Sequence, residues 1–418
     1  MTSTPLRTFR VELPYRGATD ANSSKTFRLL PRGNSRYPTV TITLPMRADA
    51  KDKKTSPGNS QKAPYLKLAG KKNIYICSGE PRALRRTPRI AGRHPRAVKH
   101  TKRMEKCSVI TLTDFKPEEL EEMLQMAAAF EAAPNRRLLE GRVVATLFFE
   151  PSTRTRLSFE TAAWRMGARV IGFSDPNVTS STKGETLHDT IKMVSGYADV
   201  IIMRHYLEGA ARYASEIADV PIINAGDGSN QHPSQTLLDL YAIKKTQGTL
   251  SDLHLCLVGD LKYGRTVHSL LPAMRHWNPS FTFVAPDELR MPAEWIEYCD
   301  EHSIAYKETS EFTPQTLRDV DVLYMTRVQR ERFSDLMEYE RVKDRYVLEP
   351  SLLNEVKPTM KVLHPLPRLN EISPLCDADP HAFYFQQARG GLYARQALIS
   401  WVLGLRLNDI LRDKSIIR

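Results

Sequence analysis

Residues Phe148 to Glu160 read FFEPSTRTRLSFE, and this stretch decides the fold because an apolar run ends in it and a helix begins. The apolar run, Val143–Phe149, predicts a buried strand. Five consecutive hydroxyl and guanidinium side chains follow it: Ser152, Thr153, Arg154, Thr155 and Arg156. Backbone N–H groups at a helix start attract anions, and the planar guanidinium of arginine matches phosphate oxygens. The stretch therefore predicts a socket for a small phosphate.

A plainer interpretation is that Ser152 or Thr153 only caps the helix and that the arginines are solvated. The alternation of hydroxyls and guanidiniums at the point where the strand gives way to the helix makes this interpretation weaker. A nucleotide is not favoured as the ligand, because the sequence contains no G-x-x-x-x-G-K-[ST] loop.

Length and composition indicate a globular protein of two or three domains, with 418 residues, 41% hydrophobic and 26% charged. The sequence has no apolar run of about eighteen residues, so no membrane partner is expected. The five cysteines form no C-x-x-C pair, which favours a reducing, cytoplasmic location and no structural zinc.

Positive charge is concentrated in the first quarter of the chain. Residues 1–105 carry 24 Lys and Arg against 6 Asp and Glu, a net charge of +18, whereas the other 313 residues carry 36 against 42, a net charge of −6. The larger part offers no general attraction to nucleic acid, which is therefore not expected as a partner.

The basic segment, residues 1–104, is rich in Pro, Ser, Thr, Lys and Arg and predicts an extension of low order. Its composition fits a transit peptide, which would direct the protein to an organelle. An equally weighted alternative is that translation starts at Met104. A nucleic-acid-binding tail on a retired enzyme scaffold is a weaker alternative, because no aromatic or groove-reading motif accompanies the charge.

From about Glu105 onward, strands alternate with helices, which is typical of a parallel α/β fold. A helix at Pro117–Ala133 leads into a first domain, residues 105–245. Its strands are expected at Val143–Phe149, Arg169–Phe173, Asp199–Arg204 and Val220–Ala225. Its helices are expected at Thr153–Met166, Glu185–Tyr197, Glu208–Ala218 and Ser234–Lys245.

A second domain, residues 246–390, is expected to begin with the strand His254–Gly259. Its other elements are expected at Arg265–His276, Phe281–Val284, Pro292–His302, Asp321–Thr326 and Met360–Leu363. A last helix, from about Tyr393 to Arg412 within residues 391–414, would complete the first domain. The predicted fold class is α/β, with two doubly wound parallel-sheet domains after the basic extension.

Polar clusters follow the carboxyl ends of the predicted strands in both domains. They are Ser152–Arg156, Arg204–His205, Asp227–His232, Asp260–Arg265, Thr326–Gln329 and His364–Arg368. Doubly wound sheets bind ligands at this edge, so the clusters predict one active-site cleft between the two domains.

Three side chains of the first domain each allow a functional and a structural interpretation. Arg204 ends an apolar strand, which favours a cleft residue over a surface arginine. His232 lies between a tight loop and a helix, close to Gln235, and a functional role is as well supported as a structural one. Lys183 lies in a hydroxyl-rich loop that by itself indicates only a solvated segment.

The second domain offers Arg265 and Arg327, which would suit a dicarboxylate held by paired hydrogen bonds. The segment HPLPR at 364–368 contains two prolines that stiffen a loop and expose backbone carbonyls. No metal-ligand cluster or Ser–His–Asp arrangement stands out in the sequence, so neither a metal nor a cofactor is expected. These residue types favour catalysis by positioning and charge stabilisation.

Taken together, residues 105 to about 412 resemble the catalytic chains of aspartate carbamoyltransferase, within the aspartate/ornithine carbamoyltransferase family. The matching segments are FFEPSTRTRLSFE, KGET, MRH, EGAAR, GDGSNQHPSQTLLDL, VGDLKYGRTVHSL, YMTRVQRER, VLHPLPR, FQQA and ARQAL. The resemblance implies transfer of a carbamoyl group from carbamoyl phosphate to L-aspartate, an early step of pyrimidine synthesis. The products would be N-carbamoyl-L-aspartate and phosphate.

The resemblance also implies a role for each matching position. The phosphate would be held by Ser152, Thr153, Arg154 and Thr155. The carbamoyl oxygen would be contacted by the catalytic residues Thr155, Arg204 and His232. The carbamoyl NH₂ would be held by Gln235 and the backbone of Pro365 and Leu366. Aspartate would be bound by Lys183, Arg265, Arg327 and Gln329.

In this family the loop that carries the Lys reaches the active site of a neighbouring subunit, so a homotrimer with shared sites is expected. Relatives would have a Ser four residues before Lys183, whereas this chain has Thr179 followed by Ser180, and either hydroxyl could take that place. The segment EGAAR at 208–212 resembles a surface that meets a zinc-containing regulatory chain in some members, which suggests such a partner.

The nearest rival is ornithine carbamoyltransferase, which shares the S-T-R-T-R socket. It would carry His-Cys-Leu-Pro where this chain has His-Pro-Leu-Pro at 364–367, and it would lack the pair Arg327 and Gln329. Both differences favour aspartate as the acceptor.

Overall fold

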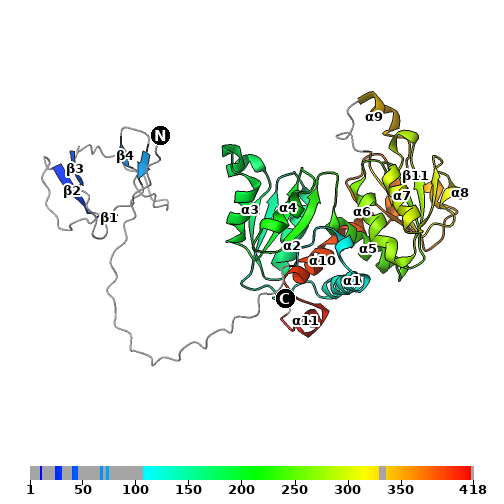
Figure 1. Ribbon diagram of the computed structural model, residues 1–418, viewed down its shortest axis with the longest axis horizontal. Helices are drawn as coiled ribbons and strands as arrows, with labels where there is room; N and C mark the ends of the chain where they lie inside the picture. Colours follow the sequence, from blue (N-terminus) through cyan, green and yellow to red (C-terminus); the bar gives the residue numbers. More distant parts are fainter. Residues whose placement is uncertain are drawn as a thin grey trace, which may run out of the picture. The chain divides into compact units, whose positions relative to one another are not determined.

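The computed structural model describes residues 107–328 and 336–415, together with five short strands before them (Figure 1). These strands are β1 (Arg10–Val11), β2 (Ser24–Leu30), β3 (Val40–Pro45), β4 (Leu66–Leu68) and β5 (Lys72–Ile74). They pair antiparallel in the orders β1-β2-β3 and β4-β5. The chain divides into two units, Met1–Arg96 and Ala97–Arg418. Apart from these strands, the extension predicted at 1–104 lies outside the described residues.

The first sheet of the second unit is parallel and has the strand order β7-β6-β8-β9. Its strands are β6 (Val143–Phe148), β7 (Arg169–Phe173), β8 (Val200–His205) and β9 (Ile222–Asp227). The helices of this domain are α1 (Pro117–Ala132), α2 (Thr153–Arg165), α3 (Leu187–Ser195), α4 (Ala210–Ile217) and α5 (Pro233–Gln247). Every residue of β8 and β9 is buried, as expected for apolar strands covered on both faces, whereas the edge strand β7 is partly exposed.

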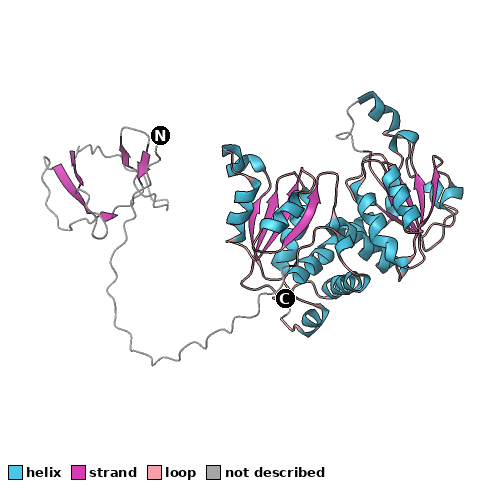
Figure 2. Ribbon diagram, viewed as in Figure 1, coloured by secondary structure: helices cyan, strands magenta, loops and turns pink. Residues whose placement is uncertain are grey.

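The second sheet is also parallel, with the order β12-β11-β10-β13-β14. Its strands are β10 (His254–Val258), β11 (Ser280–Val284), β12 (Ala305–Thr309), β13 (Val322–Met325) and β14 (Lys361–Leu363). Its helices are α6 (Arg265–Met274), α7 (Ala293–Glu301), α8 (Pro314–Leu317) and α9 (Leu336–Val342). Figure 2 shows each sheet flanked by helices, and the predicted fold class is confirmed.

The strand orders determine where ligands can bind. In the first sheet the order reverses between β6 and β8, and in the second sheet it reverses between β10 and β13. Doubly wound sheets have a crevice beyond the carboxyl ends of the strands at such a reversal. The segment 150–155 follows β6, and Arg204 lies near the end of β8. Arg265 and Arg327 follow β10 and β13, so both reversal points carry predicted site residues.

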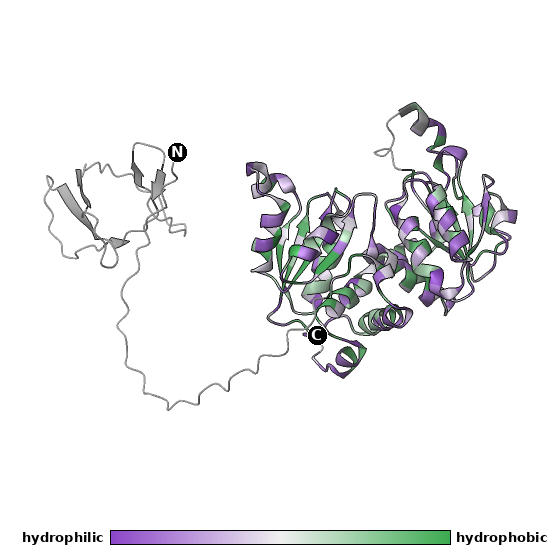
Figure 3. Cartoon of the chain, in the orientation of Figure 1, coloured by the Kyte–Doolittle hydropathy of each residue, from purple (hydrophilic) through white to green (hydrophobic). Residues whose placement is uncertain are grey.

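A shared apolar core joins the two sheets. One buried cluster includes Val144 and Ile202 of the first sheet and Leu255 and Phe281 of the second. Helices α5 and α6 contact each other between the sheets, and Figure 3 shows the hydrophobic colour concentrated on the strands. The cleft residues of both domains are therefore supported by one continuous packing.

The C-terminal helix differs from the prediction. The structure has two helices, α10 (Tyr384–Val402) and α11 (Leu407–Arg412), in place of one helix from Tyr393 to Arg412 within 391–414. The helix begins earlier because tight packing compensates for the low helix propensity of Gly390 and Gly391: a Cβ at Gly391 would lie 2.9 Å from Leu238 Cδ2. It ends near Gly404, whose φ of +80° is outside the helical region. Helix α10 packs against α1, α2 and α5 (Figure 1).

The other predicted helices and strands agree with the structure to within two residues at each end. Strand β12 was not predicted, because its sequence AYKET lacks an apolar run and it forms the edge of the sheet. The domain limits 105–245 and 246–390 stay predictions. In the described part of the chain, no helix has the length and apolar character that a membrane crossing requires.

Candidate active site

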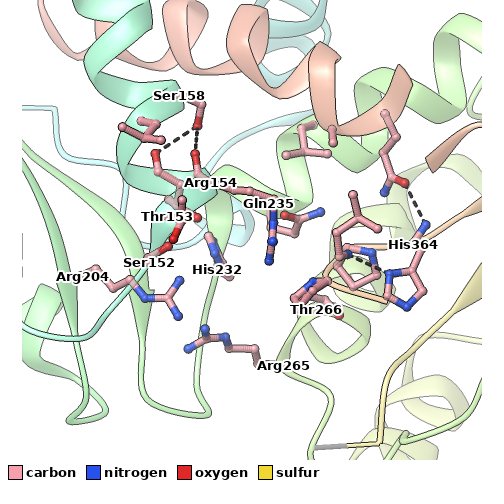
Figure 4. A pocket seen from close by; sticks show the side chains of 18 of the residues that line it. Ser152, Thr153, Arg154, Ser158, Arg204, His232, Gln235, Arg265, Thr266 and His364 are labelled. Atoms are coloured by element: carbon pink, nitrogen blue, oxygen red, sulfur yellow. Dashed lines mark hydrogen bonds between the residues drawn. The ribbon is translucent and has the colours of Figure 1, made fainter. Parts of the chain in front are cut away.

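A cleft of about 1000 Å³ lies at the two reversal points and is lined by residues of both domains. The predicted residues that line it are Ser152, Thr153, Arg154, Thr155, Arg204, His232, Gln235, Arg265, Arg327, Pro365 and Leu366. Figure 4 shows Arg204 and Arg265 reaching toward the same space from different elements. The sequence-based expectation that these segments meet in one cleft therefore agrees with the structure.

The start of α2 forms one wall of the cleft. Ser152 occupies the N-cap position but makes no capping hydrogen bond with its side chain, so its hydroxyl remains available to a ligand. Thr155 is buried, and the Ser158 hydroxyl donates to the backbone oxygens of Arg154 and Thr155 at 2.6 Å and 3.0 Å (Figure 4). The plainer interpretation is contradicted only in part: Ser152 makes no side-chain capping bond, but Thr153 and Arg154 are exposed, as that interpretation expects for the arginine.

Two arginines of this stretch have different surroundings. Partial burial lowers the pKa of Arg154, and the nearby positive charges of Arg204 and Arg327 lower it further, so cationic groups from both domains face the same space. Arg156 instead pairs with Glu160 at 3.2 Å and does not line the cleft. Because Arg154 and Arg156 are two residues apart, they lie on different faces of the helix: Arg154 lines the cleft, whereas Arg156 pairs with Glu160 on the helix surface.

Arg204 is held inside the cleft by Glu150. Its Nε donates to Glu150 Oε2 at 3.1 Å, and the residue is 8% exposed, so the surface-arginine interpretation is wrong. Arg265 Nη1 lies 4.0 Å from the same carboxylate oxygen and also donates to the Gly228 carbonyl. Glu150 thus contacts arginines from both domains. Sequence reasoning missed it, although it lies within FFEPSTRTR and an acidic residue beside arginines was a usable signal.

His232 presents a neutral imidazole to the cleft. It is the N-cap residue of α5 and is 5% exposed. Burial holds its pKa well below 6.5, and the positive charges of Arg265, Arg204 and Arg395 depress the pKa further. Its Nδ1 lies 3.3 Å from the Ser234 hydroxyl, and when that hydroxyl donates, Nε2 carries the ring proton and can serve as a donor.

The loop after β14 is fixed by the buried His364. This imidazole contacts Glu371 Oε1 through Nε2 at 2.7 Å, and its Nδ1 accepts from the Leu366 backbone N–H at 2.8 Å. The ring therefore links the backbone of Leu366 to the carboxylate of Glu371 within the same segment. Pro365 and Leu366 line the cleft as a result.

Three predicted residues do not line this cleft, and a fourth lies outside the described part of the chain. Thr179, Ser180 and Lys183 lie in and beside a short 3₁₀ helix, Ser180–Lys183, and none of them lines the cleft. The Thr179 hydroxyl accepts from Ser181 N and donates to Pro176 O, whereas Ser180 is exposed. Gln329 lies outside the described residues.

Helix α10 brings residues to the cleft that sequence reasoning did not assign to it. Gln387, Arg389 and Arg395 line it. Arg395 is 4% exposed, and burial lowers its pKa to about 10. Its guanidinium lies 5.2 Å from the Phe159 ring centroid, and its Nε has no hydrogen-bond partner among the described residues. No strand end precedes these residues in the sequence, so the strand-end rule could not find them.

The donor set of the cleft suits anions and carbonyl oxygens. Guanidiniums, hydroxyls and one neutral imidazole dominate, and the described residues contain no group of His, Cys, Asp and Glu arranged to hold a metal ion. Such a cleft between two doubly wound sheets is typical of an enzyme that handles a phosphorylated substrate.

Family models agree with this class. The model of the aspartate/ornithine carbamoyltransferase carbamoyl-P binding domain matches residues 108–245, and that of the Asp/Orn binding domain matches residues 251–402. A relative from Phocaeicola vulgatus, named aspartate carbamoyltransferase catalytic subunit, is 66% identical over 310 residues, which are 74% of this chain and 99% of the relative. The chain belongs to the aspartate/ornithine carbamoyltransferase family, and the resemblance inferred from its sequence is confirmed.

Solved structures give the same result. The catalytic subunit of M. jannaschii aspartate transcarbamoylase is 47% identical, with a TM-score of 0.67, and the match covers 71% of this chain and 97% of that one. Aspartate transcarbamoylase from Trypanosoma cruzi in complex with carbamoyl phosphate and aspartate is 36% identical, with a TM-score of 0.67, and the match covers 70% and 96%.

Proposed function

We propose that this chain transfers the carbamoyl group of carbamoyl phosphate to the amine of L-aspartate, as a step of pyrimidine synthesis. The products are N-carbamoyl-L-aspartate and phosphate. The observation that carries the proposal is the joining, in one cleft, of a helix start rich in hydroxyls with arginines from both domains. Phosphate needs the first of these features, and a dicarboxylate acceptor needs arginines on the facing side.

Carbamoyl phosphate binds against the first domain. Ser152, Thr153, Arg154 and Thr155 hold its phosphate at the N-terminus of α2, where backbone N–H groups add to the side-chain donors. Gln235 and the backbone of Pro365 and Leu366 hold the carbamoyl NH₂. This arrangement aims the carbonyl carbon toward the second domain.

The carbamoyl oxygen meets three donors: Thr155, Arg204 and His232. Negative charge develops on this oxygen when the amine attacks, so the donors stabilise the tetrahedral transition state more strongly than the bound substrate. The neutral state of His232 suits this role, because a neutral ring can donate one hydrogen bond without adding a further positive charge beside Arg204. The tetrahedral intermediate collapses with loss of phosphate, which can accept the amine proton, so no protein base is required.

Aspartate binds on the side of the second domain. Arg265 and Arg327, with Gln329 and Lys183, hold its two carboxylates. The side chain of ornithine carries a positive charge and would be repelled by these cations. Ornithine carbamoyl transfer is the second candidate, and turnover of ornithine in place of aspartate by the purified chain would overturn the proposal.

The active form is proposed to be a homotrimer in which Thr179 or Ser180, and Lys183, enter the cleft of a neighbouring subunit. Large apolar side chains are exposed on α2, the edge strand β7 and the loop after it: Trp164 is 65%, Ile171 40% and Val178 77% exposed. An exposed edge strand with apolar neighbours is suited to association. Ser180 is the better candidate for the shared hydroxyl, since the Thr179 hydroxyl already caps the 3₁₀ helix.

Mixing two inactive variants tests the shared site. Arg154→Ala and Lys183→Ala subunits, each inactive alone, are expected to recover up to about a quarter of the wild-type activity after subunit exchange, because some mixed sites receive both native side chains. Mass measurement of the exchanged trimers provides the control. Exchange without any recovered activity would contradict a Lys183 donated by a neighbour.

Further partners and the compartment complete the proposal. The segment EGAAR at 208–212 is flanked by Leu207 and Tyr213, which are 54% and 44% exposed, and this surface is proposed for a regulatory chain. The cysteines among the described residues are free thiols, which supports a reducing compartment such as the cytoplasm. An organelle remains the alternative if residues 1–104 include a transit peptide.

A further inference from the structure

The carboxyl group of Asp239, which has no role in the proposed mechanism, accepts hydrogen bonds from side chains of α5, α10 and β13. Asp239 lies on α5, one turn after Gln235, and is fully buried. Gln235 Nε2 and Gln387 Nε2 donate to its Oδ1 at 2.9 Å and 2.6 Å, and the Tyr324 hydroxyl donates to its Oδ2 at 2.8 Å. Donors from α5, α10 and β13 therefore converge on one carboxyl group.

Burying the carboxyl group of Asp239 costs free energy, because its charged form loses contact with water. Burial raises the pKa of Asp239 to about 7, although the hydrogen bonds from Gln387, Tyr324 and Gln235 oppose the rise. An apolar side chain would fill the space without this penalty, but it would leave three buried donors without an acceptor. The group is therefore needed for the orientation of its donors.

The contact with Asp239 decides which end of the Gln235 amide faces the cleft. Oδ1 of Asp239 accepts from both glutamines, and when the carboxyl group is protonated the proton can sit on Oδ2, beside Tyr324, so Oδ1 stays an acceptor and the amide nitrogen of Gln235 points to it. The oxygen and nitrogen of a carboxamide project in different directions, which turns Oε1 away from Asp239. Since Gln235 lines the cleft, it presents an acceptor there and not a donor.

Through Gln387, Asp239 also fixes the position of the loop after β14. Gln387 Nε2 is held by Asp239, so its Oε1 faces the other way and accepts from the His364 backbone N–H at 2.8 Å. The His364 ring in turn accepts from the Leu366 N–H at 2.8 Å. A continuous hydrogen-bonded path thus runs from Asp239 to the residues whose carbonyl groups border the cleft.

We propose that Asp239 is a positioning residue that orients all the acceptors for the carbamoyl NH₂ group, namely Gln235 Oε1 and the carbonyl oxygens of Pro365 and Leu366. The inference rests on the proposed function, in which these three residues hold that NH₂. Its consequence is selectivity: an acyl phosphate with CH₃ in place of NH₂ leaves the acceptors unpaired and is rejected. Asp239 therefore helps the enzyme to distinguish carbamoyl phosphate from acetyl phosphate.

The ratio of the dissociation constants of acetyl phosphate and carbamoyl phosphate tests this role. We expect Asp239→Ala to lower that ratio about tenfold or more, because the Gln235 amide can then turn its NH₂ into the cleft. Both constants are measured by calorimetry on the full chain without aspartate. Acetyl phosphate itself is expected to bind about as well as before. A purely structural defect would weaken both ligands equally.

Two matched variants serve as controls. Asp239→Asn keeps an oxygen that can accept from both glutamines, so it is expected to retain the wild-type ratio. Tyr324→Phe removes the hydroxyl that bonds to Oδ2 of the same carboxyl group and that also interacts with Gln235. It leaves the bonds of both glutamines to Oδ1 in place, so it should also retain the ratio. Thermal unfolding of each variant verifies that it is folded.

The outcomes separate the inference from the proposed function. If Asp239→Ala keeps the wild-type ratio, or lowers the affinity for both ligands alike, the inference is wrong. If that variant does not fold, Gln387→Leu decides: it should lower the ratio by a few fold, since it releases the loop alone, and an unchanged ratio would overturn the inference. A wild-type chain that forms no carbamoyl aspartate, whatever its binding ratio, would contradict the proposed function instead.

Discussion

The two sides of the cleft hold their charged groups differently. On the side of the first domain, Thr155, Arg204 and His232 are 7%, 8% and 5% exposed. On the side of the second domain, Arg265 and Arg327 are of intermediate exposure, and the side chain of Arg265 is 14% exposed. Buried donors are fixed by packing and work without reorganisation, whereas arginines of intermediate exposure retain solvent contact. Under the proposed function, the carbamoyl group that reacts is held by these buried donors, and the acceptor is bound by the less buried arginines of the second domain.

The largest effect is expected from Arg154→Ala, which removes an exposed guanidinium at the phosphate end of the first-domain side of the cleft. Removing one donor from a developing charge should lower kcat by about 10²–10³-fold. Steady-state kinetics with both substrates measure the loss. Arg156→Ala is the matched control: Arg156 lies on the same helix and pairs with Glu160 away from the cleft, so kcat should stay within about threefold. Equal losses in the two variants would contradict the assignment of the socket.

A smaller and more selective effect is expected from Arg327→Ala on the second-domain side of the cleft. The KM for aspartate should rise about 10–100-fold, since a charge-assisted contact to a carboxylate is lost, and the affinity for carbamoyl phosphate should change little. The matched control is Arg290→Ala, because Arg290 pairs with Asp287 on the exposed surface of the same domain. A rise in the KM for carbamoyl phosphate alone would break the comparison between the two sides.

The smallest effect is expected from changing the pH around neutrality. Burial keeps the pKa of His232 well below 6.5, so the ring should remain neutral from pH ~6 to ~8. Because its pKa is lower in the folded state, this group adds stability above pH ~6.5 that is lost as the pH falls toward the lowered pKa. An NMR titration of the ring protons, assigned with His232→Gln, measures this. A midpoint at or above pH ~6.5 would show that the site does not suppress the charge.

The sheets could be predicted from the sequence because apolar runs and helix starts are local features. The strand Val143–Phe148 and the helix Thr153–Arg165 were found within one residue of their limits. The early start of α10 could not be found, because it depends on the fit of Gly391 against Leu238, which no local pattern reports. Strand β12 was missed for a related reason: its pairing with β11, and not its composition, makes it a strand.

In the candidate site too, local sequence features predicted some residues, and other residues depend on tertiary contacts. Residues just past strand ends, such as Arg204 and Arg265, could be predicted because topology brings strand ends together. Glu150 was missed although an acidic residue beside arginines was a usable signal, whereas Asp239 could not be predicted, since its role depends on which partners face it across helix contacts. The loop with Lys183 was expected in the site only through the family resemblance, and in a single described chain it does not line the cleft.

Helix α10 has a consequence for the synthesis of this protein. Gln387 and Arg395 line the cleft, and both are encoded after the last strand of either sheet. A nascent chain can therefore form its first sheet while α10 is still inside the ribosome, but its apolar face on α1, α2 and α5 stays open until that helix emerges. The complete cleft can therefore form only after α10 has emerged, later than the strands of both sheets.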